Sequence, residues 1–230
     1  MLSLEDFRAD MEESLTWRIE EYTLLKNTLR ENNKNPIVKT LIVMLYAHFE
    51  GFFKDCLECY IKMLNSTKFK LEKFCNEIVT ASLSEEFSSF ENINKKCKVL
   101  ITVPPYESYL HKFHRRRDLT IAFRDNYIKK EIRLKEKIIN TKSNLSYATV
   151  QENLYILGLD YNFFEEKKDD INCLLNLRNA VAHGSRREPI DYEKFKNIET
   201  KIINIMNDLI VYLYQYCYER KYLINNKKTP

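Results

Sequence analysis

Residues 37–65 read IVKTLIVMLYAHFEGFFKDCLECYIKMLN, and apolar side chains fall on nearly every side of the helix that this stretch predicts. Such a helix would be about 45 Å long. A helix that is hydrophobic all round lies in the middle of a bundle. The 230 residues include only 3 Gly and 5 Pro, too few for the turns of an all-β fold. The sequence therefore predicts an all-α bundle built around residues 37–65.

Four further helices are predicted from apolar spacing and capping residues. The first covers about residues 4–30, with Ser3 as its N-cap. A second begins at Ser146 and ends at Gly158, and a third runs from about residue 162 to Gly184. The last follows Asp191 and extends for close to thirty residues. We expect one domain over residues 1–230.

Residues 66–144 show a less regular pattern, and we interpret them as an insertion between core helices, with residues 99–103 as a short strand or an extended link. From His111 to Lys137 there are ten Lys or Arg and four Asp or Glu, which gives +6, so the rest of the +4 chain carries −2. A local positive charge favours contact with phosphate, whereas a solvated helix face is the alternative. We predict solvation for most of the segment and RNA contact at five side chains: Lys112, His114, Arg115, Arg116 and Arg117.

The apolar runs and the cysteines indicate where in the cell the protein is expected. No apolar run follows a basic start, so we expect no signal peptide, and the densest apolar stretch, residues 41–47, is too short to cross a bilayer. Six cysteines in a chain that can build its own core fit reduced thiols and a cytoplasmic location. Cys56 and Cys59 form a CxxC pair, with no second pair beside it, and buried filler is the favoured interpretation over zinc or redox use.

The helix before Gly184 carries a charge on its apolar stripe. Ile171, Leu174, Leu175, Arg178 and Ala182 share one face, so Arg178 points where an apolar side chain is expected. A guanidinium does not lose its proton in proteins, so it needs a carboxylate or a bound anion. Glu50, which interrupts the apolar 37–65 helix, is the predicted internal partner. A phosphate would be the partner of Arg178 in function.

His183 lies one turn after Asn179 and five residues after Arg178, about 140° apart from it on an ideal helix. The two side chains converge only if the helix loosens near Gly184. A histidine beside an arginine can move the proton of a 2′-hydroxyl or leaving oxygen while the arginine stabilises charge on phosphate. This chemistry needs no metal or other cofactor, and we expect none.

The stretch RNAVAHG, residues 178–184, resembles the Arg-x4-6-His signature of HEPN domains, here with four intervening residues. The surrounding sequence agrees, with YAHFEGFFK on the apolar helix and SNLSYATVQENLYILGL before the motif helix. The chain is similar in particular to the RiboL-PSP-type HEPN subfamily. The resemblance covers about residues 36–65 and 145–220.

This resemblance implies a HEPN-like helical bundle that forms a homodimer and cleaves RNA without metal, as a toxin or anti-phage defence effector. Arg178 and His183 would be catalytic, with Asn179 and Glu50 in support. An antitoxin or another defence protein would be a partner. Two alternatives stay open. The chain could be a non-catalytic HEPN module that binds RNA or protein, or Arg178 and Glu50 could form a purely structural salt bridge, with His183 a helix cap.

Overall fold

The computed structural model describes residues 2–30, 36–100, 102–127, 129–185 and 188–224. These residues form helices and contain no β-strand, so the predicted all-α fold is confirmed. In chain order the α-helices are α1 (Leu4–Arg30), α2 (Pro36–Ser66), α3 (Asn76–Ser82), α4 (Ser84–Glu91), α5 (Tyr109–Ala122), α6 (Tyr147–Ile156), α7 (Lys168–Ala182) and α8 (Tyr192–Tyr218).

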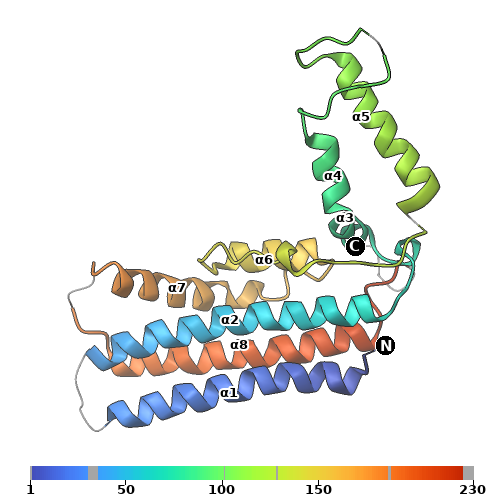
Figure 1. Ribbon diagram of the computed structural model, residues 1–230. Helices are drawn as coiled ribbons and strands as arrows, with labels where there is room; N and C mark the ends of the chain where they lie inside the picture. The colour runs from blue at the N-terminus through green and yellow to red at the C-terminus, as the bar shows by residue number, and fades with distance from the viewer. Residues whose placement is uncertain (1, 31–35, 101, 128, 186–187, 225–230) are drawn as a thin grey trace.

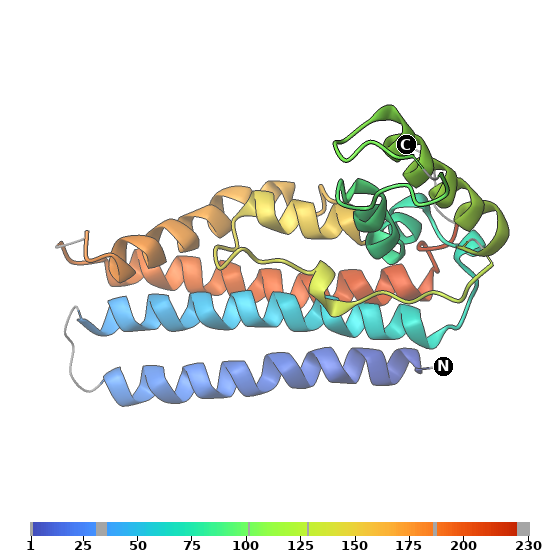
Figure 2. The same cartoon turned by 45° about the horizontal axis from the view of Figure 1, so that its top comes forward.

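Helix α2 lies at the centre of the bundle, as its apolar sequence predicts. It packs against α1, α7 and α8, and α1 and α8 also contact each other. Figures 1 and 2 show α1, α2 and α8 running side by side, with α6 and α7 stacked along the other side of α2 and α8. The largest fully buried side chains include Phe49, Phe52, Phe53 and Tyr60 of α2. Burial of several such residues is the main stabilising term of the bundle.

The capping residues predicted from the sequence are confirmed. Ser3 Oγ accepts a hydrogen bond from the Asp6 amide, and Ser146 Oγ accepts one from the Thr149 amide. Asp191 caps α8 through the amides of the second and third residues that follow it. The start of α7 at Lys168, six residues later than predicted, is a correction. There the Asp160 carboxylate accepts from the Asn162 amide, and this local turn competes with a helix.

Part of the predicted insertion projects from one end of the bundle. Helices α4 and α5, with the loop between them, form an arm that stands away from the core helices (Figure 1). The chain then returns along the bundle, where the side chain of Asn65 bonds to both backbone groups of Leu134 at 2.8 and 2.9 Å. Residues 99 and 100 form a bend rather than a strand, and residue 101 lies outside the described residues.

An ion pair joins α1 to α8 inside the bundle. Lys26 Nζ lies 2.6 Å from both carboxylate oxygens of Glu199, whose side chain is only 7% exposed. A buried carboxylate is expensive without its cation, because the charge has lost its water. Lys26 therefore fixes how α1 lies against α8.

Replacement of Lys26 by Met should lower the free energy of unfolding by about 2 kcal/mol, because Glu199 would stay buried without its cation. Urea denaturation measures this loss. The double variant Lys26→Met/Glu199→Leu is the control, and it should recover most of the stability. A single variant as stable as the wild type would contradict the assigned role of Lys26.

Candidate active site

The motif helix α7 places its apolar stripe against α2. Ile171, Leu174 and Leu175 are buried, and Arg178 follows them on the same face, as the spacing predicts. The helix ends at Ala182, and His183 is its C-cap. Gly184 adopts a φ of +65°, the left-handed geometry that commonly ends helices. The end of α7 lies at the end of the bundle away from the arm (Figures 1 and 2).

Three groups hold the guanidinium of Arg178. Its Cζ lies 4.0 Å from the centroid of the Tyr46 ring on α2, which is a cation–π stack. Its Nη2 donates to the backbone oxygen of Ser143 and to the side-chain oxygen of Asn144, each at 3.0 Å. The hydroxyl of Tyr46 in turn accepts from the Leu145 amide at 2.6 Å. We call Tyr46, Ser143 and Asn144 the arginine cradle.

The predicted ion pair between Arg178 and Glu50 is wrong, because no ion pair joins the two among the residues that the structure describes. Tyr46, one turn before Glu50 on α2, takes the contact with the guanidinium instead. Burial raises the pKa of the Tyr46 hydroxyl, and the charge of nearby Glu50 raises it further. Glu50 thus lies close to the cradle without neutralising the arginine.

The loop of the cradle has an uncommon backbone. Lys142 and Ser143 are consecutive and both have a φ of +54°, a backbone angle that residues other than glycine rarely adopt. The Asn140 side chain accepts from the Lys142 amide, and the Lys142 ammonium pairs with Glu152. Such strain persists only where neighbouring contacts fix it, and it often occurs at functional sites. Here it turns the Ser143 carbonyl toward Arg178.

His183 and Asn179 lie on the other side of the motif. The His183 amide still donates to the Asn179 carbonyl at 2.9 Å, so the helix is regular up to this point. The His183 side chain is exposed, and no hydrogen bond or ion pair connects it to Arg178 within the described residues. Two buried polar atoms of the motif, Arg178 Nε and Asn179 Oδ1, have no hydrogen-bond partner. Groups of this kind call for an explanation, such as a ligand or water.

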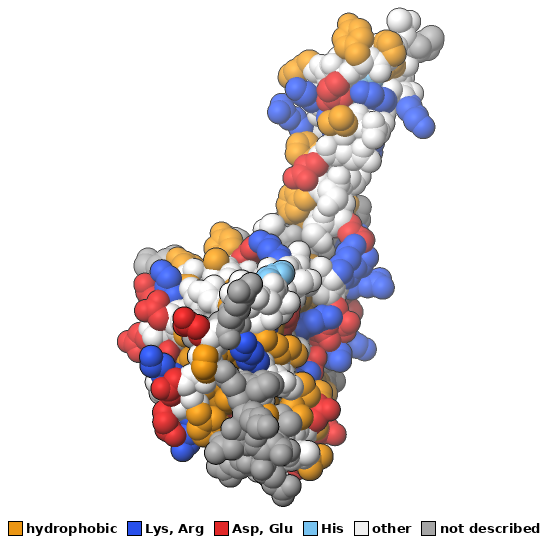
Figure 3. All heavy atoms as spheres, turned by 90° about the vertical axis from the view of Figure 1, so that its left-hand side faces the viewer, with side chains coloured by type: hydrophobic (Ala, Val, Ile, Leu, Met, Phe, Trp, Pro, Cys, Tyr) orange, Lys and Arg blue, Asp and Glu red, His pale blue; other side chains and the backbone are white. Residues whose placement is uncertain are grey.

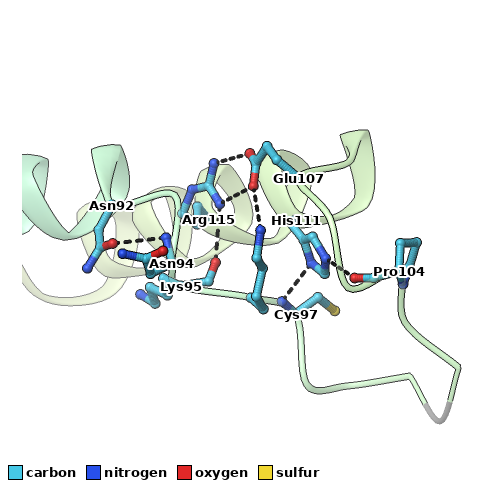
Figure 4. Close-up of polar contacts among 9 residues, drawn as sticks. Asn92, Asn94, Lys95, Cys97, Pro104, Glu107, His111 and Arg115 are labelled. Carbon is cyan, nitrogen blue, oxygen red and sulfur yellow. Dashed lines mark hydrogen bonds and ion pairs between the residues drawn. The ribbon is translucent and has the colours of Figure 1, made fainter.

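The five predicted RNA-binding residues lie on α5, in the arm, and they differ in exposure. Lys112, Arg116 and Arg117 are exposed. Arg115 is a correction, because it is 5% exposed and its Nη2 lies 2.6 Å from Glu107 (Figure 4). His114 is largely covered and lies 3.5 Å from Asp118. A charge count along the sequence does not show that the carboxylate of Glu107, in the loop before α5, pairs with Arg115.

Figure 3 looks onto the bundle end that carries the motif, with the arm above it. Acidic and basic side chains are mixed over the bundle in this view, whereas Lys and Arg gather around the outer part of the arm. The arm and the motif are therefore separate features of one chain.

Cys56 and Cys59 are buried and unpaired, as predicted for filler. Burial raises the pKa of the Cys56 thiol, and it raises that of Cys59 to about 11, so both thiols stay protonated. In the described part of the chain, no group of three or more His, Cys, Asp or Glu is placed to hold a metal ion. No described helix is long and apolar enough to span a membrane.

An all-helical bundle with Arg-x4-His at the end of its penultimate helix is the arrangement expected of a HEPN domain. The family model described as RiboL-PSP-HEPN matches residues 13–215, and the chain belongs to this family. The match is wider than the resemblance noted in the sequence, since it spans most of α1 and the arm. No curated protein and no solved structure matches the chain. The family is associated with a nuclease or RNA-binding role.

The cradle predicts slow exchange of the Arg178 Nε proton with water, because this nitrogen is buried. Tyr46→Leu removes the ring and should speed the exchange by about tenfold or more, as measured by NMR on nitrogen-15-labelled protein. Tyr46→Phe is the matched control, since it keeps the ring and loses only the hydroxyl. An unchanged rate in Tyr46→Leu would show that the ring does not hold the arginine.

Proposed function

We propose that this protein is a metal-independent endoribonuclease of the HEPN type. The observation that carries the proposal is the state of Arg178. Its guanidinium stacks on Tyr46 and donates to two neutral oxygens, with no carboxylate partner among the described residues. A fixed cation that no internal anion neutralises is suited to a phosphate, and arginine binds phosphate with a planar fork of donors.

The chemistry is internal transesterification of the RNA backbone. The 2′-oxygen attacks the adjacent phosphorus and loses its proton, and the bond from phosphorus to the 5′-oxygen breaks. His183 takes the proton from the 2′-hydroxyl and returns one to the leaving 5′-oxygen, because imidazole is the usual general acid or base near neutral pH. Arg178 stabilises the charge that develops on the phosphoryl oxygens. The products are a 2′,3′-cyclic phosphate and a 5′-hydroxyl, and in this proposal His183 and Arg178 do the work that a metal does in other nucleases.

Asn179 and Glu50 have supporting roles in this proposal. Asn179 Oδ1 is buried without a hydrogen-bond partner and lies one turn before His183, where it can accept from the imidazole N–H and orient the ring. Glu50 lies near the Tyr46 hydroxyl, and it helps to set the charge around the cradle. Both are positioning residues.

We further propose that the protein works as a homodimer. Arg178 faces α2 and the cradle, whereas His183 lies exposed beyond the end of the same helix. A second copy with its α7 end against the first would bring the histidine of one chain to the arginine of the other. The cellular role we propose is that of a cytoplasmic toxin or anti-phage effector, held in check by an antitoxin or another defence partner.

The pure protein should cleave single-stranded RNA in EDTA and leave an all-DNA oligonucleotide intact, because only RNA has the attacking 2′-hydroxyl. Arg178→Ala and His183→Ala should each lower the rate by about a hundredfold or more. Gel analysis with end-labelled RNA measures the rate and identifies the cyclic phosphate.

Arg8→Ala is the matched control for a lost arginine, since Arg8 is exposed on α1, where it pairs with Glu12 and lies over the Tyr214 ring, as Arg178 lies over Tyr46. It should cleave like the wild type. The conservative variant Arg178→Lys keeps the positive charge and so tests whether slow cleavage is due only to unfolding of the cradle loop. It should also cleave RNA slowly, because lysine lacks the planar fork of donors. Cleavage that is the same in all these variants would overturn the proposal, and RNA binding without any cleavage would favour the non-catalytic module.

A second prediction follows if each active site combines Arg178 of one chain with His183 of the other. An equimolar mixture of the Arg178→Ala and His183→Ala proteins, refolded together, should regain about a quarter of wild-type activity, because half of the dimers would hold one complete site. Each variant refolded alone is the control. If the mixture stays inactive while the wild type is dimeric by sedimentation, each chain must carry its own complete site.

A further inference from the structure

The helix α5 presents two different faces, and its inner face fixes it in the arm. The Cys97 amide donates to His111 Nδ1 at 3.0 Å, so His111 Nε2 carries the proton and donates to the Pro104 carbonyl at 2.7 Å. Arg115 pairs with Glu107 on the same side (Figure 4). These buried contacts hold the loop between α4 and α5 against the helix, so the outer face has a defined geometry.

The outer face carries aromatic rings followed by arginines. Tyr109 is 73% exposed and Phe113 is 50% exposed, and their ring centres are 6.3 Å apart. Tyr109, Phe113, the Arg116–Arg117 pair and Ile121 recur every three or four positions, so they form a stripe about 18 Å long on α5, and Arg124 follows just beyond the helix. The stripe lines a shallow hollow and consists of Tyr109, Phe113, Arg116, Arg117, Ile121 and Arg124. We call it the outer stripe.

The charge of the outer stripe is positive, and none of the described side chains that line its hollow is a carboxylate. The acid on the helix is Asp118, which is half-buried and lies 3.4 Å from Lys95, 3.5 Å from His114 and 3.7 Å from Arg117, so one carboxylate is shared among three basic groups. Arg116 and Arg117 are exposed, and Lys112 adds a further positive charge beside Phe113. An anion could therefore approach the stripe without meeting a negative group in the hollow.

We propose that the outer stripe binds single-stranded RNA, with bases stacked on Tyr109 and Phe113 and phosphates bound by Arg116 and Arg117. Only unpaired bases can stack on side chains, whereas a duplex hides their faces. An acidic protein would satisfy the arginines equally well. The two exposed rings beside them favour RNA, because every base offers a flat face and every linkage a phosphate. The choice of RNA as ligand rests on the proposed nuclease function.

The outer stripe lies on the arm, at the opposite end of the bundle from the motif (Figures 1 and 2). It is therefore a separate recognition surface, and its role is to bind the substrate rather than to act on the scissile phosphate. A long RNA would contact the stripe of one chain while a remote part of the same strand reached the motif.

The test measures binding without cleavage. In the His183→Ala background, Tyr109→Ala/Phe113→Ala should weaken binding of a fluorescent, unstructured RNA oligonucleotide by about tenfold or more. Arg116→Gln/Arg117→Gln should lower the slope of log affinity against log salt by about one to two. The wild-type stripe should prefer the single strand to a duplex of the same sequence. Fluorescence anisotropy over a series of salt concentrations gives all three results.

Tyr155 and Tyr161 provide the matched control, because they are a second pair of exposed rings, 5.8 Å apart and outside the arm. Tyr155→Ala/Tyr161→Ala should bind like the parent protein. Equal RNA affinity in the stripe variants and the parent would overturn the inference, and the stripe would then serve a protein partner. Loss of binding in the stripe variants supports the inference even if the wild type never cleaves RNA, so the two proposals fail separately.

Discussion

Burial of α2 on all sides is the constraint on which the rest of the structure depends. Because nearly every face of this helix is apolar, α1, α7 and α8 must all pack against it. The stripe of α7 that faces α2 ends in Arg178, so the same packing that buries Leu174 brings the guanidinium onto Tyr46. The position of the motif arginine is thus a consequence of how the core forms.

The sequence predicted the elements better than the contacts between them. Helix α1, the central helix and three capping residues follow from periodicity and local hydrogen bonds, which a single segment contains. The partner of Arg178 does not, because it depends on a loop 35 residues away with two left-handed residues. Misplaced charges on two helices pointed to Glu50. Tyr46, one turn earlier on α2, takes the contact because its ring can stack on the guanidinium.

Arg115 shows the same limit for surface charge. Ten basic residues in one segment raise its charge, but Lys135 and Lys137 share an ion pair with Glu85, and Arg115 pairs with Glu107. What remains basic is decided by the fold, which turns Arg116 and Arg117 outward and Arg115 inward on one helix. A count of residues therefore located the basic segment, and helical geometry selects the side chains that a ligand can reach.

The end of α7 decides how His183 is oriented relative to Arg178, and this orientation constrains the mechanism. Gly184 permits a change of direction only after His183, whose amide is still bonded to the Asn179 carbonyl. The helix therefore does not loosen early enough to bring His183 round to Arg178, and the two side chains keep the divergence of a regular helix. A single chain offers a held arginine on one side and an exposed histidine on the other. In the homodimer that we propose, a second copy of the same helix end would supply the missing half of each site by symmetry.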